Sequence, residues 1–127
     1  MFILHKFVTR GVGVVSEKSI DSGKVIGYYY TRNHTLNSTD RIHQINGVSW
    51  YESYPLGRYV NHNHISPNLT AELDNMGLIL KTSEKIPPHT ELTIDYNVLS
   101  RLLDAYEDGT FKYDYHPEPI NITKNII

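Results

Sequence analysis

Short runs of β-branched and aromatic residues recur along the first three quarters of the chain, separated by polar or turn-forming positions. Turn signals such as Asp21-Ser22-Gly23 and Ile86-Pro87-Pro88 punctuate these runs, a pattern that predicts short strands. We expect strands at residues 2–8, 12–15, 25–31, 48–51, 58–61, 70–73, 76–82 and 91–96. Residues 32–46 are polar and show no clear period, so we expect an insertion or a long loop there.

One segment near the C-terminus has helical spacing instead. Its apolar residues recur at intervals of three and four, and they are Val98, Leu99, Leu102, Leu103 and Tyr106. Asp95 or Asn97 can cap the start of this helix, and Gly109 can close its end. The pattern therefore predicts one mostly β domain over residues 1–127, with a core at about 7–96 and a C-terminal helix and tail at 97–127.

Composition narrows the function classes. The chain has 127 residues, a formal net charge of −2 and no cysteine, which excludes disulfides, Cys-ligated zinc, iron–sulfur clusters and a cysteine nucleophile. The charge balance requires no nucleic-acid partner, and no apolar run reaches membrane-spanning length or resembles a secretion signal. We expect a soluble, intracellular protein. Its ten tyrosines are either functional or half-buried packing residues.

The first motif is Gly11-Val12-Gly13, where two glycines one residue apart allow a backbone to approach a ligand closely. No helix pattern or third glycine follows, so a dinucleotide-binding loop is excluded. A plain tight turn is the alternative.

The second motif runs from Arg58 to Asn68 and is rich in amide and imidazole side chains. The spacing of His62 and His64 allows a metal site with Glu72 as a third ligand, although the glutamate is farther away than a cupin-like barrel requires. Alternatively, the Asn and His side chains hold a tight backbone crossing and bind a polar ligand. A loop whose Asn side chains satisfy its own backbone is the third interpretation.

The third motif is Glu91-Leu92-Thr93-Ile94-Asp95-Tyr96. Strand alternation places Leu92, Ile94 and Tyr96 on one face. Tyr96 could project its hydroxyl into a pocket, or it could simply cover the core.

Taken in order, the three motifs resemble those of the SET-domain protein-lysine methyltransferases. Gly11-Val-Gly-Val, Arg58-Tyr-Val-Asn-His with Pro67-Asn68, and Glu91-Leu-Thr-Ile-Asp-Tyr96 occur in the family's order and at fitting intervals. The resemblance covers residues 7–96 and is to the short, stand-alone viral type of SET protein. Two departures are Asn63, where the family has serine, and Tyr28-Tyr29-Tyr30-Thr31, where it has Tyr-x-Gly.

The resemblance implies a β-clip-like fold of several small sheets with a threaded, pseudoknot-like C-terminal segment. It implies S-adenosylmethionine as the cofactor, a lysine of a protein or peptide as the substrate, and a homodimer by analogy with short relatives. Tyr96 would be the catalytic residue. Cofactor contacts would come from Gly11, Val12, Gly13, Arg58, Asn61, His62 and Tyr96, with Arg58 mainly bracing the crossing. No metal is implied.

The tail adds a hypothesis about the substrate. Five acidic residues and only one lysine lie between Asp104 and Glu118, interleaved with aromatic residues. We expect this segment to fold over the site, where its acids would attract a basic, histone-like peptide. The substrate channel would then be lined by Tyr29, Tyr106, Phe111, Tyr113 and Tyr115. The alternatives are a solvated tail and, for the whole chain, an inactive SET-like module that only binds peptides.

Overall fold

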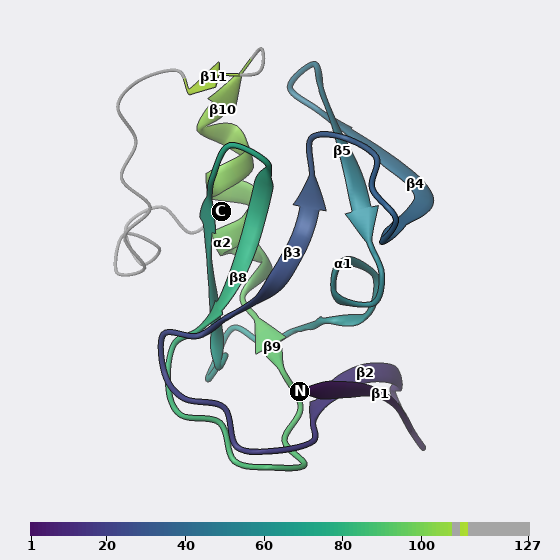
Figure 1. The fold of residues 1–127 in the computed structure, drawn as a ribbon, viewed down its shortest axis with the longest axis vertical. Helices are drawn as coiled ribbons and strands as arrows, with labels where there is room; N and C mark the ends of the chain where they lie inside the picture. Colours follow the sequence, from purple (N-terminus) through teal and green to yellow (C-terminus); the bar gives the residue numbers. More distant parts are fainter. Residues whose placement is uncertain (108–109, 112–127) are drawn as a thin grey trace.

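A five-stranded antiparallel sheet forms the centre of the protein. The computed structural model describes residues 1–107 and 110–111. The strand order of this sheet is β4-β5-β3-β8-β7 (Figure 1). Its strands are β3 (Val25–Thr31), β4 (Ser38–Ile45), β5 (Val48–Ser53), β7 (Leu69–Leu73) and β8 (Gly77–Thr82).

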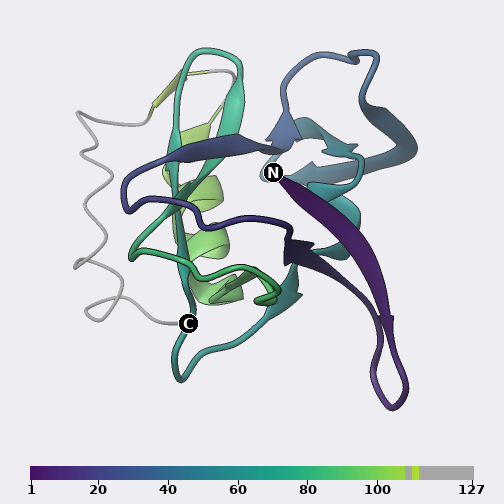
Figure 2. The same ribbon diagram turned by 60° about the horizontal axis from the view of Figure 1, so that its bottom comes forward.

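Three two-stranded sheets surround this centre. An antiparallel hairpin pairs β1 (Phe2–Phe7) with β2 (Gly11–Ser16), and its turn extends away from the rest of the molecule (Figure 2). Another antiparallel pair joins β10 (Tyr106–Glu107) to β11 (Thr110–Phe111). The third sheet is parallel and pairs β6 (Asn61–His62) with β9 (Thr93–Ile94). The predicted class, mostly β with several small sheets, is confirmed.

The parallel pair marks a crossing between two distant chain segments. Asn68 holds the second segment with its buried side chain: its Nδ2 donates to the Glu91 carbonyl at 2.9 Å, and its Oδ1 accepts from the Thr93 N–H at 2.9 Å. On the other side, the Leu92 N–H donates to the Val14 carbonyl of β2 at 2.8 Å. For the second motif, the interpretation that its Asn side chains hold a tight backbone crossing is confirmed for Asn68, and the binding of a polar ligand stays a prediction.

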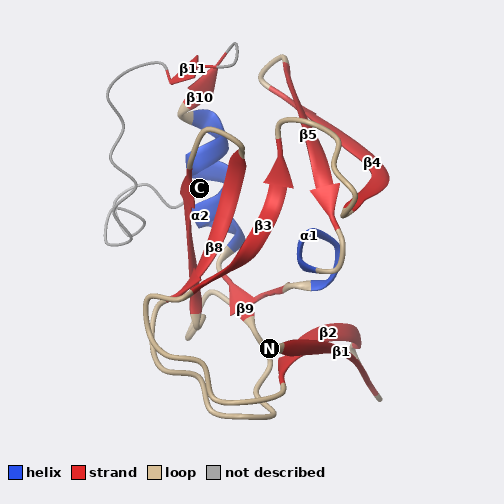
Figure 3. Ribbon diagram, in the orientation of Figure 1, coloured by secondary structure: helices blue, strands red, loops and turns tan. Residues whose placement is uncertain are grey.

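Two helices complete the described chain, α1 (Leu56–Tyr59) and α2 (Tyr96–Asp104), shown in blue in Figure 3. Asp95 caps α2 by accepting a hydrogen bond from the Asn97 N–H at 3.0 Å. The apolar face of α2 is buried and consists of Val98, Leu99, Leu102 and Leu103. The short C-terminal helix is confirmed, although it ends at Asp104 rather than at Gly109.

The polar stretch 32–46 is not a loop throughout, because residues 38–45 form β4 at the edge of the central sheet. Apolar periodicity is weak there because the strand has only one neighbour, and one of its faces packs polar side chains. The predicted strand at 58–61 is also wrong, since residues 56–59 form α1. Its short turn is closed by the Tyr59 N–H bonding to the Pro55 carbonyl at 2.9 Å. The strand expected at 91–96 is reduced to residues 93–94, and Tyr96 begins α2.

The core lies between the central sheet and α2. Its largest fully buried side chains are Trp50, Leu78, Leu80, Ile86, Leu92 and Ile94, which together join β5, β8 and the crossing. Neither helix of the described chain has the length and apolar character needed to cross a membrane.

Candidate functional site

Asn61 connects the crossing to the N-terminal hairpin. Its Nδ2 donates to the Val12 carbonyl at 3.1 Å and to Glu91 Oε2 at 2.7 Å. Both partners are oxygens that only accept, so the amide nitrogen must face them and the orientation of this side chain is fixed. Among the described residues no donor bonds to Asn61 Oδ1, which therefore remains available to a ligand.

The glycines of the first motif have different roles. A Cβ on Gly13 would lie 2.5 Å from Glu91 Oε2, 2.8 Å from Phe7 Cε2 and 3.0 Å from Asn61 Nδ2. Only glycine therefore lets the hairpin approach Asn61 and Glu91 this closely. Gly11 has φ +81° and open space around its Cα, so its role is conformational.

Glu91 also forms an ion pair with Arg10, whose guanidinium lies 3.9 Å from the centre of the Phe7 ring. The carboxylate side chain is only 12% exposed, whereas Arg10 is 55% exposed. The hairpin is thus fastened to the segment that leads into the crossing.

His62 supports the start of α2. Its Nδ1 accepts a hydrogen bond from the Tyr96 N–H at 2.9 Å, so this nitrogen carries no proton and a neutral ring is protonated on Nε2. The His62 ring packs against the Tyr96 ring, with centroids 4.9 Å apart, and stacks on the His64 ring, with centroids 5.7 Å apart. The second motif therefore positions Tyr96 through both its backbone and its ring.

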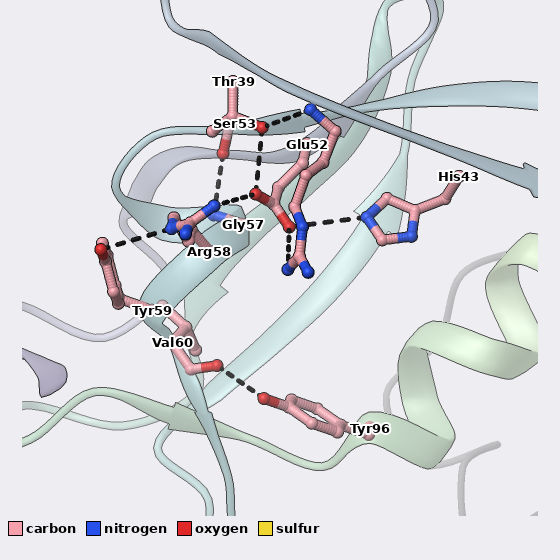
Figure 4. Close-up of polar contacts among 10 residues, drawn as sticks. Thr39, His43, Glu52, Ser53, Gly57, Arg58, Tyr59, Val60 and Tyr96 are labelled. Carbon is pink, nitrogen blue, oxygen red and sulfur yellow. Dashed lines mark hydrogen bonds and ion pairs between the residues drawn. The ribbon is translucent and has the colours of Figure 1, made fainter. Parts of the chain in front are cut away.

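Two tyrosine side chains, Tyr29 and Tyr96, lie near each other next to this crossing. The Tyr96 hydroxyl donates to the Val60 carbonyl at 2.9 Å, as the lower part of Figure 4 shows. The buried side chain of Tyr29 lies close enough to Tyr96 for each to change the pKa of the other. Burial raises the pKa of Tyr29, and the neighbouring Tyr96 raises it further. Burial likewise raises the pKa of Tyr96, so both phenols are neutral at physiological pH.

The three consecutive tyrosines of β3 have separate surroundings. Tyr28 donates to Asp74 Oδ2 at 2.6 Å, and this bond raises the pKa of Tyr28 to about 12. Tyr30 stacks on His43, and burial raises its pKa to about 12. Tyr96 raises the pKa of both Tyr29 and Tyr30 but is not among the causes for Tyr28, so Tyr29 and Tyr30 are the two tyrosines of β3 that lie near Tyr96.

Glu52 is a buried carboxylate that sequence reasoning missed. It is 4% exposed and accepts a hydrogen bond from the Thr39 hydroxyl at 3.0 Å. Three basic side chains lie within 4 Å of it: that of Arg41, and those of His43 and Arg58, which are labelled in Figure 4. Thr39, Arg41 and His43 alternate along β4, so one face of this strand holds Glu52. In the sequence, the alternation of Thr39, Arg41 and His43 was a sign of this cluster. It lay within residues 32–46, for which a loop was expected.

The remaining predicted residues have other surroundings. Arg58 contacts Tyr59 and Glu52, neither of which belongs to the crossing, so its bracing of the crossing stays a prediction. Tyr106 lies beyond the opposite end of α2 from Tyr96, where its ring packs on Trp50 and its hydroxyl accepts from Arg32. The side chain of Phe111, and Tyr113 and Tyr115 altogether, lie outside the described residues.

The metal alternative would need Glu72 beside the two histidines. Glu72 instead accepts a hydrogen bond from Lys81 at 3.2 Å. Within residues 1–107 and 110–111 no group of three potential ligands is arranged to hold an ion.

The small sheets and the parallel crossing make up a β-clip-type architecture. The candidate site, with Tyr29 and Tyr96, lies at the crossing. A model of the SET domain matches residues 11–97, which is more than half of the chain. The protein therefore belongs to the SET-domain family.

The structural comparison agrees in fold. The crystal structure of a Plasmodium falciparum protein, described as a "putative histone methyltransferase", aligns with a TM-score of 0.52 and 20% sequence identity. The alignment covers 76% of this chain and 96% of that one. No curated protein matches at a significant level.

Proposed function

We propose that this protein transfers a methyl group from S-adenosylmethionine to a lysine side chain of a protein or peptide. The observation that carries the proposal is the pair of neutral tyrosine hydroxyls next to the Asn61–His62 crossing. Membership of the SET family supports it, because this family consists largely of protein-lysine methyltransferases.

The residues at the crossing fit this cofactor. Gly13 lets the hairpin pack closely against Asn61 and Glu91, and the free Oδ1 of Asn61 can accept a hydrogen bond from an ammonium group. Exposed aromatic rings, those of Tyr96 and the His62–His64 stack, lie alongside. The cofactor supplies, when bound, an electrophilic methyl group on a positively charged sulfur.

The tyrosines would orient the lysine amine. A free lysine has a pKa of about 10.4, so it must lose its proton before its nitrogen can accept a methyl group. The two phenols are neutral and are thus poor bases, so water must accept this proton. Desolvation of the lysine amine lowers its pKa and favours the loss of the proton. Tyr96 donates to Val60 and interacts with Tyr29, and a remaining lone pair on its oxygen can accept from the amine N–H. Correct alignment of the reactants is then the main source of acceleration.

The substrate side of the proposal follows from the sequence. A basic, histone-like peptide would complement the acidic residues between Asp104 and Glu118, and an extended peptide would dock as an added strand. The setting would be intracellular, with no direct nucleic-acid or membrane partner, and a homodimer remains part of the proposal by analogy only.

The decisive experiment is incubation with radiolabelled S-adenosylmethionine and a mixture of histones and basic peptides. We expect label on lysine and a loss of about tenfold or more in Tyr96→Phe, since the variant keeps the ring but loses the orienting hydroxyl. Tyr54→Phe is the matched control, because Tyr54 is 50% exposed and lies outside this site. Equal labelling by wild type and Tyr96→Phe would contradict the assigned role.

Calorimetry separates this enzyme from the inactive peptide-binding module. Binding of S-adenosylmethionine by the wild type is expected, followed by turnover. Peptide binding without any cofactor binding would favour the module instead.

A further inference from the structure

Two arginines border a surface pocket beside the edge of the central sheet. Arg41 comes from β4, which is an edge strand, and Arg58 comes from α1. Their side chains are 64% and 41% exposed, so solvent reaches both. The pocket has a volume of about 400 Å³. It is lined by Ser38, Thr39, Asp40, Arg41, Tyr54 and Arg58.

The hydrogen-bond donors of these two arginines are largely unused. Arg41 Nη1 lies 3.9 Å and Arg58 Nη1 lies 3.6 Å from the Glu52 carboxylate, and both distances are longer than an ordinary hydrogen bond. Arg58 Nε donates to the Tyr59 hydroxyl at 3.3 Å, whereas in the described chain Arg41 donates no side-chain hydrogen bond. Asp40 also lines the pocket, but among the same residues it forms no ion pair with either arginine. Free N–H groups of two guanidinium groups therefore border the pocket.

A guanidinium group is best matched by an anion with two oxygens. Its planar fork of N–H groups binds a carboxylate or a phosphate through two parallel hydrogen bonds. Glu52 does not fill this role, because it is only 4% exposed and its Oε1 already accepts from the Thr39 hydroxyl. A group that enters the pocket must bring acceptor oxygens of its own, and a further cation there would be repelled.

Tyr30 connects this pocket to the proposed site of methyl transfer. The pairing of β3 with β5 places Tyr30 opposite Glu52, so the two side chains lie on the same face of the sheet. Burial raises the pKa of Tyr30, the neighbouring Glu52 and Tyr96 raise it further, and Arg41 lowers it. Tyr30 therefore lies near both Arg41 and Tyr96.

Arg58 reaches the same region along the chain. It precedes Val60 by two residues, and the Val60 carbonyl accepts a hydrogen bond from the Tyr96 hydroxyl at 2.9 Å (Figure 4). Consecutive Cα atoms are about 3.8 Å apart, so two residues span at most about 8 Å. An extended peptide advances about 3.3 Å per residue. A side chain held by Arg58 would therefore belong to a residue about two to four positions from a lysine bound at Tyr96.

We propose that this pocket is a subsite for an anionic side chain of the peptide substrate, a carboxylate or a phosphate, which Arg41 and Arg58 hold a few residues from the target lysine. The inference rests on the proposed function and deepens it by adding a requirement on the substrate. A basic residue at the same position is disfavoured, so the substrate combines this acidic position with basic residues elsewhere.

The test is a scan of lysine peptides that carry a single glutamate, glutamine or phosphoserine at successive positions on either side of the lysine. We expect the wild type to prefer glutamate over glutamine by about three- to tenfold in kcat/KM at one or two neighbouring positions, mainly through a lower KM. Comparison with phosphoserine shows whether the pocket favours a carboxylate or a phosphate. In Arg41→Gln and in Arg58→Gln the ratio of glutamate to glutamine should fall close to one.

Arg101→Gln is the matched control, because it removes the same charge from α2 and Arg101 does not line the pocket. Its ratio should equal that of the wild type. Labelling of the wild type's peptides without any preference for glutamate, or a preference that both arginine variants retain, overturns the subsite. The scan of the wild type needs no variant, so poor folding of Arg58→Gln does not affect it. If no peptide is labelled, the proposed function fails instead, and fluorescence anisotropy of the same peptides then tests the subsite through binding alone: equal affinity for the glutamate and glutamine peptides overturns it.

Discussion

At the residue scale, glycine at position 13 determines whether the site can form. A Cβ there would collide with Glu91 and Asn61, whereas Gly23 has open space and only a positive φ of +77°. We expect Gly13→Ala to weaken binding of S-adenosylmethionine by about tenfold or more, since the hairpin must move away from Asn61. Gly23→Ala should cost about 1–2 kcal/mol of unfolding free energy through backbone strain, with unchanged affinity. Calorimetry and urea unfolding measure the two effects. Equal loss of affinity in both variants would contradict the packing argument.

The tyrosines of β3 predict a dependence of stability on alkaline pH. The hydrogen bond to Asp74 raises the pKa of Tyr28 to about 12, and burial raises that of Tyr30 to about 12. The unfolded state has a tyrosine pKa of about 10, so it loses these protons first. The stabilisation is complete below pH 10 and disappears as the pH rises from 10 to 12.

Urea unfolding at several values between pH 9 and pH 12 measures this loss. Tyr28→Phe removes one of the contributing groups, so its unfolding free energy should fall less steeply with pH than that of wild type. Tyr54→Phe should follow the wild-type curve. A Tyr28→Phe curve parallel to wild type would show that Tyr28 does not contribute.

At the element scale, the stability of strand β4 depends on its contacts with one buried carboxylate, that of Glu52. The Thr39 hydroxyl donates a hydrogen bond to Glu52 at 3.0 Å, shorter than the contacts of Glu52 with Arg41, His43 and Arg58 at 3.5–3.9 Å. Thr39→Val keeps the shape of the side chain but leaves Glu52 short of a donor, which should cost about 1–3 kcal/mol of unfolding free energy. Thr39→Ser retains the hydroxyl and should cost less. If both variants unfold at the same urea concentration, the hydrogen bond is not what stabilises this strand.

Strands β3 and β4 and helix α1 show which elements the sequence could predict and which it could not. Residues 25–31 form the expected strand because consecutive β-branched and aromatic residues are packed between two neighbouring strands. Residues 38–45 were missed because this edge strand directs polar side chains, Thr39 and the largely exposed Arg41, toward Glu52 and so carries no apolar alternation. Residues 58–59 became helical because tertiary packing of Leu56 and Gly57 outweighs the strand preference of Tyr59.

The residues of the candidate site were easier to predict from the sequence than strand β4 and helix α1. Asn61, His62 and Tyr96 were identified because ordered motifs specify them, and the crossing does bring them together. The contacts of Glu52 and Arg10 could not be predicted in this way. Both residues contact side chains that are distant in the sequence, and the local pattern around them does not indicate these contacts. Long-range pairing of charges leaves no periodic trace in a sequence.

At the scale of the whole molecule, Asn68 connects the crossing to everything around it. Its amide bonds to the backbone at both Glu91 and Thr93, and the same segment also bonds to β2. Asn68→Ala leaves a buried N–H and a buried carbonyl without partners, which should cost about 2–4 kcal/mol of unfolding free energy. Because the segment from Glu91 to Tyr96 carries the site, affinity for S-adenosylmethionine should fall together with stability.

A variant of the neighbouring loop separates this effect from general damage to residues 61–68. Asn63 Oδ1 accepts from the N–H groups of Ile65 and Ser66, so it organises only its own turn. Asn63→Ala should therefore cost less stability than Asn68→Ala and change the affinity little. If the two variants lose stability and affinity to the same extent, the loop acts as a unit and Asn68 has no special part in holding the crossing. If Asn68→Ala alone loses both, the hydrogen bonds between distant segments maintain the geometry on which the proposed methyl transfer depends.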